Sequence, residues 1–589
     1  MKINIKKIGL LLGLGALAVC QSCVDLEPEI YSKVDADTFN QNPEVFESKL
    51  GDVYVNLQRE YGYVYREGYW SLQENTTDEC FVPTRYMGDW YDKGIFAQLR
   101  NHDFNSTLRE VSQNGQNGNN AWQFLSRGIA KCNDMLDWMN SVGADRFHPS
   151  EYAEVYILRA WYHYIMMDTF GKIPFMDKVG EASPLQLTRA AACDSIMANL
   201  KRYINDASTE QIPSRVNKFV GYMTLAKMYL NAEAWGVLGQ SNEFPADPTE
   251  CYNLAAEYAS KVITESKYEL EGNYFDNFKV QNQNSKENIW SVFYDADYSK
   301  GMQFHMMTLH YASQEEYGLK NKPWNGYCTS HKVIALYGEG DTRINSWARG
   351  PQPKGASVPV DSATFVNMPA YVRLPEGYPQ TLADLGRDTI KADIKENGKK
   401  IGEKDSIVYK TVTLEFPGYF TDTLTTFEND ALTKIYNVFE GARFVKFEVE
   451  SGVGDHMSND FPIFRLADAY LMKAEALMRA NGGVANGDAV EAANKVRSRA
   501  GAKPYTTGTL TLDELCNERV RELCWEGHRR QDLIRFGRFT GSNSVVNESD
   551  PANLWVFRKV QSEEHKKIFP LPDFIIANYG YPQNPGYVD

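Results

Sequence analysis

The sequence predicts an all-α scaffold of degenerate TPR-like helix pairs, joined to a large, irregular, loop-rich half with minor β structure. Apolar residues recur at spacings of three and four in several segments, which is the pattern of amphipathic helices. Gly-containing turns separate these segments, and short helices of this kind are stable only when they pack on one another. Residues 267–460 lack the helical period and are rich in Gly, Asn, Asp and aromatic residues.

The N-terminus predicts export and a lipid anchor. A lysine-rich start precedes the apolar run 8–19, which is too short to span a bilayer but suits a secretory signal. Cys23 then stands where a bacterial lipoprotein carries its acylated cysteine, and Cys20 is the competing position. An ordinary signal peptide with an incidental cysteine is the alternative. We predict a signal peptide over residues 1–22, a lipidated tether over 23–38 and a single domain over 39–589.

Charge and cysteine usage exclude several classes of protein. The net charge of −15 argues against a nucleic-acid partner, because phosphate binding needs a basic face. The seven cysteines after Cys23 are an odd number at wide spacings, so they form no disulfide framework and are expected to be buried. No His/Cys ligand spacing occurs, so we predict no metal or other cofactor.

Helices are expected in order from residue 39 to about residue 266. The first is predicted over residues 39–57, and an irregular aromatic-rich stretch over 60–103 follows it. His148-Pro149 begins a later helix that Gly171 ends, and Thr188 caps the next one. The remaining helical patterns of this part cover residues 122–139, 222–232 and 252–262.

The loop-rich insertion, residues 267–460, contains one alternating segment at 406–415 that predicts a short strand. The densest helical pattern follows it, in residues 461–539. Within this block a second helix is expected over 488–499, and a third begins at Thr511 with Glu514 in a capping box. The first helix of the block carries one apolar stripe of Ile463, Leu466, Tyr470, Ala474 and Leu477. The Pro- and Gly-containing tail is expected to lie extended over the core.

Two loops combine aromatic side chains with polar groups, as sugar recognition requires. Flat apolar faces suit the C–H side of pyranose rings, while Asp, Asn and Arg hydrogen-bond the hydroxyls. The candidates of the first loop are Asp78, Arg85, Tyr86, Trp90 and Tyr91. Those of the second are Tyr298, Trp324 and Asn325, in a loop that also contains Tyr311, Tyr317 and Tyr327. The structural alternative is that these aromatic rings fill the core beneath the loops.

Acidic and basic residues alternate densely from Glu518 to Asp532. Such charges pair with one another three and four apart on a helix, so we interpret the run as structural, with Arg529 and Asp532 tying the last helices together. The motifs GxSxG, HExxH, GxGxxG and the P-loop are absent, and no catalytic residue is predicted. Two of the many Asp and Glu side chains could still lie close together in the folded protein, as the carboxylate pair of a glycosidase does.

Several segments together resemble the SusD/RagB family of surface lipoproteins of Bacteroidetes. The matching stretches are residues 76–94 and 159–175, Asn325-Gly326, Asp341-Thr342-Arg343, RLADAYLMKAEAL, VRSRAG, ERVRELCWEGHRRQDLIRFGRF, and IFPLP followed by NPGY. The resemblance covers nearly the whole mature chain. It implies a SusD-like superhelix in which four TPR-like helix pairs support the irregular half.

The resemblance also implies a function. Family members bind nutrients, mostly glycans, in loops at the two places named above, so Trp90 or Tyr91 and Trp324 are the expected stacking residues. Asp78 and Arg85 are the expected polar contacts. The implied protein is no enzyme; it is anchored in the outer membrane facing the cell exterior and delivers oligosaccharides or polysaccharides to a SusC-like TonB-dependent transporter. A RagB-like peptide-binding lipoprotein and a lipid-anchored glycoside hydrolase are the alternatives.

Overall fold

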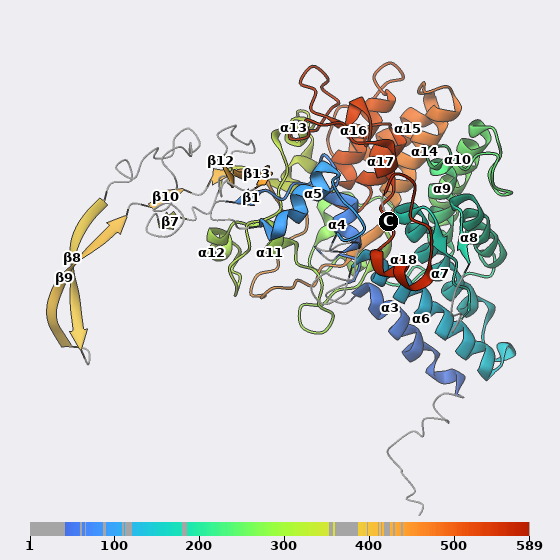
Figure 1. The fold of residues 1–589 in the computed structure, drawn as a ribbon, viewed down its shortest axis with the longest axis horizontal. Helices are drawn as coiled ribbons and strands as arrows, with labels where there is room; N and C mark the ends of the chain where they lie inside the picture. Colours follow the sequence, from blue (N-terminus) through green and yellow to red (C-terminus); the bar gives the residue numbers. More distant parts are fainter. Residues whose placement is uncertain are drawn as a thin grey trace, which may run out of the picture.

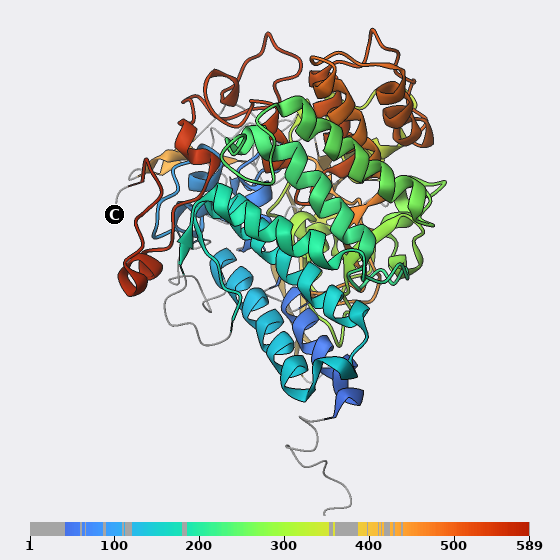
Figure 2. The same cartoon turned by 90° about the vertical axis from the view of Figure 1, so that its right-hand side faces the viewer.

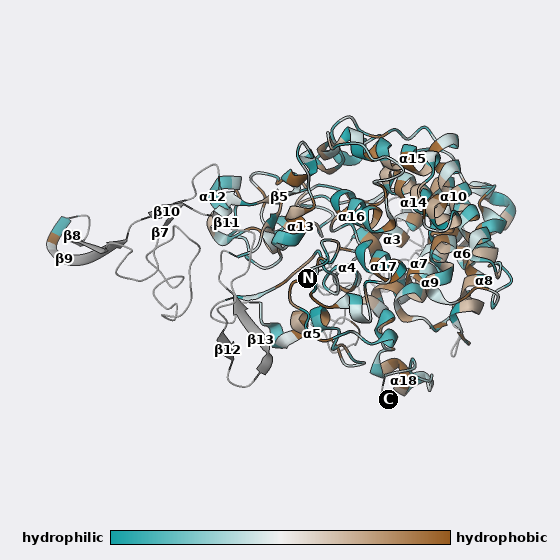
Figure 3. Cartoon of the chain, turned by 90° about the horizontal axis from the view of Figure 1, so that it is seen from above, coloured by the Kyte–Doolittle hydropathy of each residue, from teal (hydrophilic) through white to brown (hydrophobic). Residues whose placement is uncertain are grey.

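The computed structural model describes residues 42–587, except 59–61, 65, 67, 86–89, 109–110, 112–119, 179–184, 353–356, 360–386, 397–398, 410, 414, 417–424, 428–429 and 437–439. The predicted signal peptide, Cys23, the tether and Tyr86 lie outside the described residues, and the domain boundaries stay predictions. The body is mostly helical, and in Figure 3 hydrophobic residues concentrate in its helices. This confirms the predicted fold class.

Long helices stack on one another in chain order. They are α3 (Phe46–Gln58), α6 (Ala121–Val142), α7 (Pro149–Phe170), α8 (Arg189–Tyr203), α9 (Lys218–Trp235), α10 (Pro248–Glu265), α14 (Leu466–Ala480), α15 (Gly487–Arg499) and α16 (Leu512–Leu523). Helix α6 packs on α7, α7 on α8, α9 on α10 and α14 on α15. Figure 2 looks onto this stack. Helix α14 packs on α10, so the stack resumes where it was interrupted, after the long insertion (Figure 1).

Side-chain caps explain where the helices begin. His148 forms a capping box with Glu151 before α7, and the Thr188 hydroxyl accepts the backbone N–H of Ala191 before α8. The Thr511 hydroxyl accepts the backbone N–H of Glu514 before α16. These predicted starts are confirmed. The first helix, in contrast, begins only at Phe46, after a single 3₁₀ turn over Pro43–Val45.

Three local predictions are wrong. Residues 461–465 form strand β15 (Phe461–Arg465), which pairs antiparallel with β4 (Asn288–Val292). A short apolar run such as residues 461–464 fits a buried strand as well as a helix. The irregular stretch contains α4 (Tyr69–Glu74) and α5 (Ile95–Asn101), and the tail contains α18 (Asp573–Tyr579). These helices are too short to show a period in the sequence, and tertiary packing stabilises them.

The insertion consists of short helices and two-stranded ribbons. Strand β9 (Lys399–Tyr409) pairs with β8 (Arg387–Glu396) far from the helical body in Figure 1. The predicted strand at 406–415 falls on β9, β10 (Thr411–Thr413) and the start of β11 (Glu415–Phe416). Strand β1 (Thr84–Arg85) pairs in parallel with β13 (Asp430–Tyr436), and this pairing ties the first candidate loop to the insertion.

The charged run of α16 and α17 (Arg529–Arg535) is buried and paired. Arg343, Arg465 and Arg499 all reach the carboxylate of Glu522, at 3.0 Å for the first two. Asp532 accepts from Arg519 at 2.7 Å, and Arg529 donates to the Cys516 carbonyl of α16 at 3.2 Å, so both residues tie the last two helices together as predicted. Arg529 also pairs with Asp78. The predicted structural role of this run is thereby confirmed.

All seven cysteines after Cys23 are buried and free of disulfides. In the described part of the chain no helix is long and apolar enough to cross a bilayer. Nor does any group of three His, Cys, Asp or Glu side chains in that part have the arrangement of a metal site.

Candidate functional site

The second candidate loop is held by its main chain. Four successive backbone N–H groups, those of residues 324–327, donate to the carbonyls of Met306, Met307 and Leu309 at 2.7–3.0 Å. These carbonyls belong to or follow helix α11 (Phe304–Thr308). Because all four N–H groups have an acceptor, these hydrogen bonds fix the loop against helix α11.

The structure brings the two candidate loops together at Trp90 and Trp324. The indole N–H of Trp90 donates to the main-chain carbonyl of Trp324 at 2.6 Å. The two residues are 234 positions apart in the chain, and both side chains are half-buried. We call Trp90 and Trp324, which this side-chain-to-main-chain hydrogen bond connects and whose rings keep part of their surface in solvent, the indole pair.

The backbone of the first loop adopts an uncommon conformation at this point. Trp90, Asp92 and Lys93 have φ of 60°, 45° and 59°. Non-glycine residues enter the left-handed region rarely, and such positions persist only where surrounding contacts hold them. Tyr91, half-buried, sits between them. The loop is therefore held in the conformation that presents Trp90.

Each indole of the pair has identified neighbours. The ring of Trp90 lies over the backbone of Gly326 and meets Tyr327 edge-on, with centroids 5.4 Å apart and planes at 89°. The guanidinium of Arg66 lies 4.9 Å from the centroid of the Trp324 ring. The hydroxyl of Tyr327 donates to the Arg66 carbonyl at 2.9 Å, which links these neighbours to one another.

Arg85 and Asn325 support the loop from the inside. Arg85 is buried, and its guanidinium donates to the carbonyls of Asn325, Gly326 and Glu440 at 3.2, 3.3 and 2.8 Å. The Asn325 side-chain oxygen accepts from Arg443 at 2.8 Å, and burial lowers the pKa of both arginines. Their predicted contact with a sugar remains untested, but in this structure these groups bind protein.

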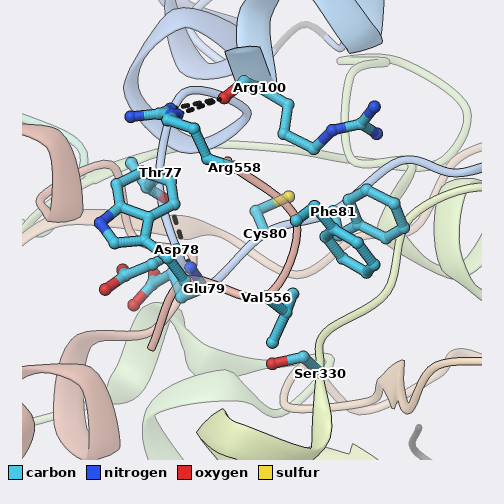
Figure 4. Close-up of a pocket in the computed structure, with 11 residues that line it drawn as sticks. Thr77, Asp78, Glu79, Cys80, Phe81, Arg100, Ser330, Val556 and Arg558 are labelled. Carbon is cyan, nitrogen blue, oxygen red and sulfur yellow. Dashed lines mark hydrogen bonds between the residues drawn. The ribbon is translucent and has the colours of Figure 1, made fainter. Parts of the chain in front are cut away.

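Asp78 lies in a pocket lined by residues 77–81, Arg100, Ser330 and residues 555–558 (Figure 4). Its carboxylate receives two hydrogen bonds from Arg529, at 2.7 and 2.8 Å. The pocket has an empty volume of about 310 Å³, part of it open to solvent. On its upper side in Figure 4, Arg558 donates to the carbonyl of Arg100. The structure thus engages Asp78 in an ion pair instead of bringing it to the indole pair.

Tyr298 is the most exposed of the predicted residues. Its side chain is 93% exposed, at the tip of a turn in which the Asp295 carboxylate accepts the N–H groups of Asp297 and Tyr298. Backbone hydrogen bonds between Asp295 and Ser299 close the turn. Within the described residues no ring contact or hydrogen bond joins Tyr298 to either indole.

Two neighbours of the indole pair, Arg66 and Gly326, were missed from the sequence as functional residues, whereas Tyr327 was among the aromatic residues named in the second loop. Arg66 lies in the aromatic-rich stretch, where no spacing distinguishes it. Tyr327 and Gly326 directly follow candidates of the second loop, and Gly326 belongs to a matching pair of the family resemblance. Only the fold reveals their role, because the contacts join segments more than 200 positions apart.

The arrangement suits non-covalent recognition. Partly exposed indoles offer apolar faces for stacking, and a guanidinium group, that of Arg66, lies beside one of them as a hydrogen-bond donor. This is the chemistry of a binding surface for flat, polar-rimmed ligands such as sugar rings.

Comparison with known proteins gives consistent matches. The model of the SusD family matches residues 286–587, and one described as starch-binding associating with the outer membrane matches residues 26–230. The starch-binding protein SusD of Bacteroides thetaiotaomicron is 27% identical over 521 residues, which is 84% of this chain and 83% of that protein.

Solved structures with the same fold include surface glycan-binding protein A from Bacteroides thetaiotaomicron. The TM-score is 0.62 at 19% sequence identity, over 93% of this chain and 100% of that one. The same protein in complex with laminarihexaose gives 0.62 at 18% identity, over 92% and 99%. At this identity the likeness establishes the fold alone.

Proposed function

Because this chain belongs to the SusD family, we propose that it is a cell-surface glycan-binding lipoprotein whose ligand stacks on Trp90 and Trp324. The observation that carries the proposal is the hydrogen bond between the Trp90 indole and the Trp324 carbonyl. It joins the two loops in which the sequence places aromatic and polar residues, and it leaves both rings half-buried. Core aromatics would instead be fully enclosed, as Trp70 and Trp161 are.

The proposed platform consists of the indole pair with Tyr91 beside it and Tyr298 as an outer contact. We leave Asp78, Arg85 and Asn325 out of direct ligand contact, because all three are buried and bonded to protein. The polar contacts then come from groups at the rim, among them Arg66, whose guanidinium lies 4.9 Å from the centroid of the Trp324 ring.

The ligand class we propose is a glucan. One relative is named for starch and one structural neighbour holds laminarihexaose, and both are glucose polymers. Glucose rings in the chair form have equatorial hydroxyls and two apolar C–H faces, which an indole can cover.

The proposed location is the outer membrane, facing the exterior, with acylated Cys23 as the anchor and a SusC-like TonB-dependent transporter as the recipient of the glycan. The description of the matching family model, which refers to association with the outer membrane, supports this location. Two or three acyl chains, at about 0.8 kcal/mol per buried methylene, hold a protein firmly on a membrane. Substituting Cys23→Ser in the full-length protein should move it from the membrane fraction to the soluble fraction. Retention in the membrane would disprove the anchor.

A binding screen tests the proposed function. The protein lacking residues 1–23 is titrated calorimetrically with maltoheptaose, laminarihexaose, an acidic oligosaccharide and a mixture of oligopeptides. Binding to one of the two glucans without new reducing ends is the expected result. Binding to peptides alone would favour a peptide-uptake protein. A steady release of reducing ends would favour a hydrolase.

A further inference from the structure

The ring of Trp90 lies so close to Gly326 that any side chain at position 326 would overlap with it. A Cβ atom at Gly326 would lie 2.3 Å from Cε2, 2.4 Å from Cζ2 and 2.7 Å from Cδ2 of the Trp90 ring. These three atoms belong to the middle and benzene side of the indole, so the ring lies with its face on the glycine. Real Cβ contacts are essentially never shorter than 3.0 Å.

The backbone itself does not require glycine at this position. Gly326 is not among the glycines with positive φ, so an alanine there would adopt its backbone conformation without left-handed strain. The methyl group of that alanine would, however, overlap with the indole ring of Trp90. The absent side chain of Gly326 is therefore a seat for the ring of Trp90.

We propose that Gly326 is a positioning residue for glycan binding, because the ring of Trp90 lies on it and is thereby fixed in place. The inference rests on the proposed function of the indole pair. Seating brings the Trp90 N–H within 2.6 Å of the Trp324 carbonyl, so a displaced Trp90 also releases its hold on the second loop. The same device occurs in the core, where Gly128 faces the ring of Tyr162, but there the ring is fully buried.

The seat is itself held in place from behind. The N–H of Gly326 donates to the Met307 carbonyl at 2.9 Å, and its own carbonyl accepts from Arg85 at 3.3 Å. Because both main-chain groups of Gly326 are bonded to buried partners, its backbone cannot move away from Trp90 to make room for a methyl group. The indole must move instead.

Radical footprinting of Gly326→Ala tests the seat without a ligand. Trypsin releases Trp90 in the peptide of residues 86–93, and Trp138 in a separate peptide serves as an internal reference. The oxidation rate of Trp90 should rise in Gly326→Ala, while that of Trp138 stays constant. Gly338→Ala is the matched control, since a Cβ there meets no atom within 4 Å. An unchanged Trp90 rate in Gly326→Ala would overturn the proposal.

Calorimetry with maltoheptaose and laminarihexaose then separates the seat from the platform. Gly326→Ala should bind the glucan that the wild type binds about tenfold more weakly, the factor for one lost aromatic contact of ~1.4 kcal/mol. In the Trp90→Ala background the same glycine substitution should have no further effect, and the double variant should melt like Trp90→Ala. A full additional loss in that background would overturn the positioning role. If Trp90 becomes reactive but neither variant loses affinity, the seat stands and the proposed platform fails.

Discussion

Buried arginines support both the ion-pair network around Glu522 and the indole pair. They bind side-chain carboxylates in the network and main-chain carbonyls at the indole pair. In the network, the guanidinium groups of Arg343, Arg465 and Arg499 meet one carboxylate and join the insertion to the helical stack. At the indole pair, Arg85 donates hydrogen bonds to the main-chain carbonyls of Asn325 and Gly326. Side-chain charge therefore fixes whole elements, whereas carbonyl contacts shape a loop whose aromatic rings stay partly in solvent.

The largest expected effect comes from removing the centre of the network. Glu522→Ala leaves three buried guanidinium groups without this carboxylate, which is expected to reduce the free energy of unfolding by about 3–5 kcal/mol. Chemical denaturation measures this loss. Lys261→Ala removes the exposed pair with Glu257 and should change it by less than about 0.5 kcal/mol. Similar losses in the two variants would contradict the structural role of the network.

Arg85→Ala is expected to have a smaller effect on stability but an additional effect on binding. The Glu440 carbonyl keeps Arg443 as a donor, so two carbonyls, those of Asn325 and Gly326, lose theirs. At about 0.5–1.5 kcal/mol net for each hydrogen bond, the expected loss of stability is about 1–3 kcal/mol. The loop of residues 324–327 should loosen, so glucan affinity should fall in protein that is still folded. The folded fraction of Glu522→Ala should bind normally. If folded Arg85→Ala bound the glucan with wild-type affinity, Arg85 would not be needed to position the platform.

Two buried carboxylates, Glu522 in the network and Asp460 at the end of the insertion, predict opposite responses to pH. Burial would raise the pKa of Glu522, but Arg499 and Arg465 outweigh it and lower the pKa to about 2. The stability from this group is present above its unfolded pKa and is lost as pH falls toward 2. Burial raises the pKa of Asp460 from 3.8 to about 7. The stability from Asp460 is therefore complete below 3.8 and is lost as pH rises to 7.

Asp460→Asn isolates the second of these responses. The amide oxygen can still accept the N–H of Tyr294, which the carboxylate accepts at 3.1 Å, and it does not titrate. Unfolding free energies between pH 4 and pH 8 should therefore decline less in the variant than in the wild type. Parallel curves would show that Asp460 keeps an ordinary pKa.

Tyr298→Ala should have the smallest effect on the fold. A side chain that is 93% exposed contributes little packing, so the unfolding free energy should stay within about 0.5 kcal/mol of the wild type. As an outer contact it should change glucan affinity by less than about tenfold. A larger loss than that of Trp90→Ala would move the centre of the platform to the turn at Asp295–Ser299.

The helical stack could be predicted from the sequence because its signals are local. Caps such as His148 and Thr188 act within three residues, and the period of each long helix repeats several times. The pairing of Trp90 with Trp324 is different, since it depends on a glycine and on carbonyls that the sequence does not distinguish from others. Residue type suggested the two tryptophans, but the same reasoning selected Asp78, whose partner Arg529 lies 451 positions away.

The affinity of the Trp90→Ala/Trp324→Ala double variant for the glucan bound by the wild type tests the central claim most directly. Calorimetry should show a loss of about hundredfold or more, the sum of two aromatic contacts of ~1.4 kcal/mol each. The circular dichroism spectrum should remain that of the folded protein. Wild-type affinity in the folded double variant would contradict the claim that the indole pair binds the glycan.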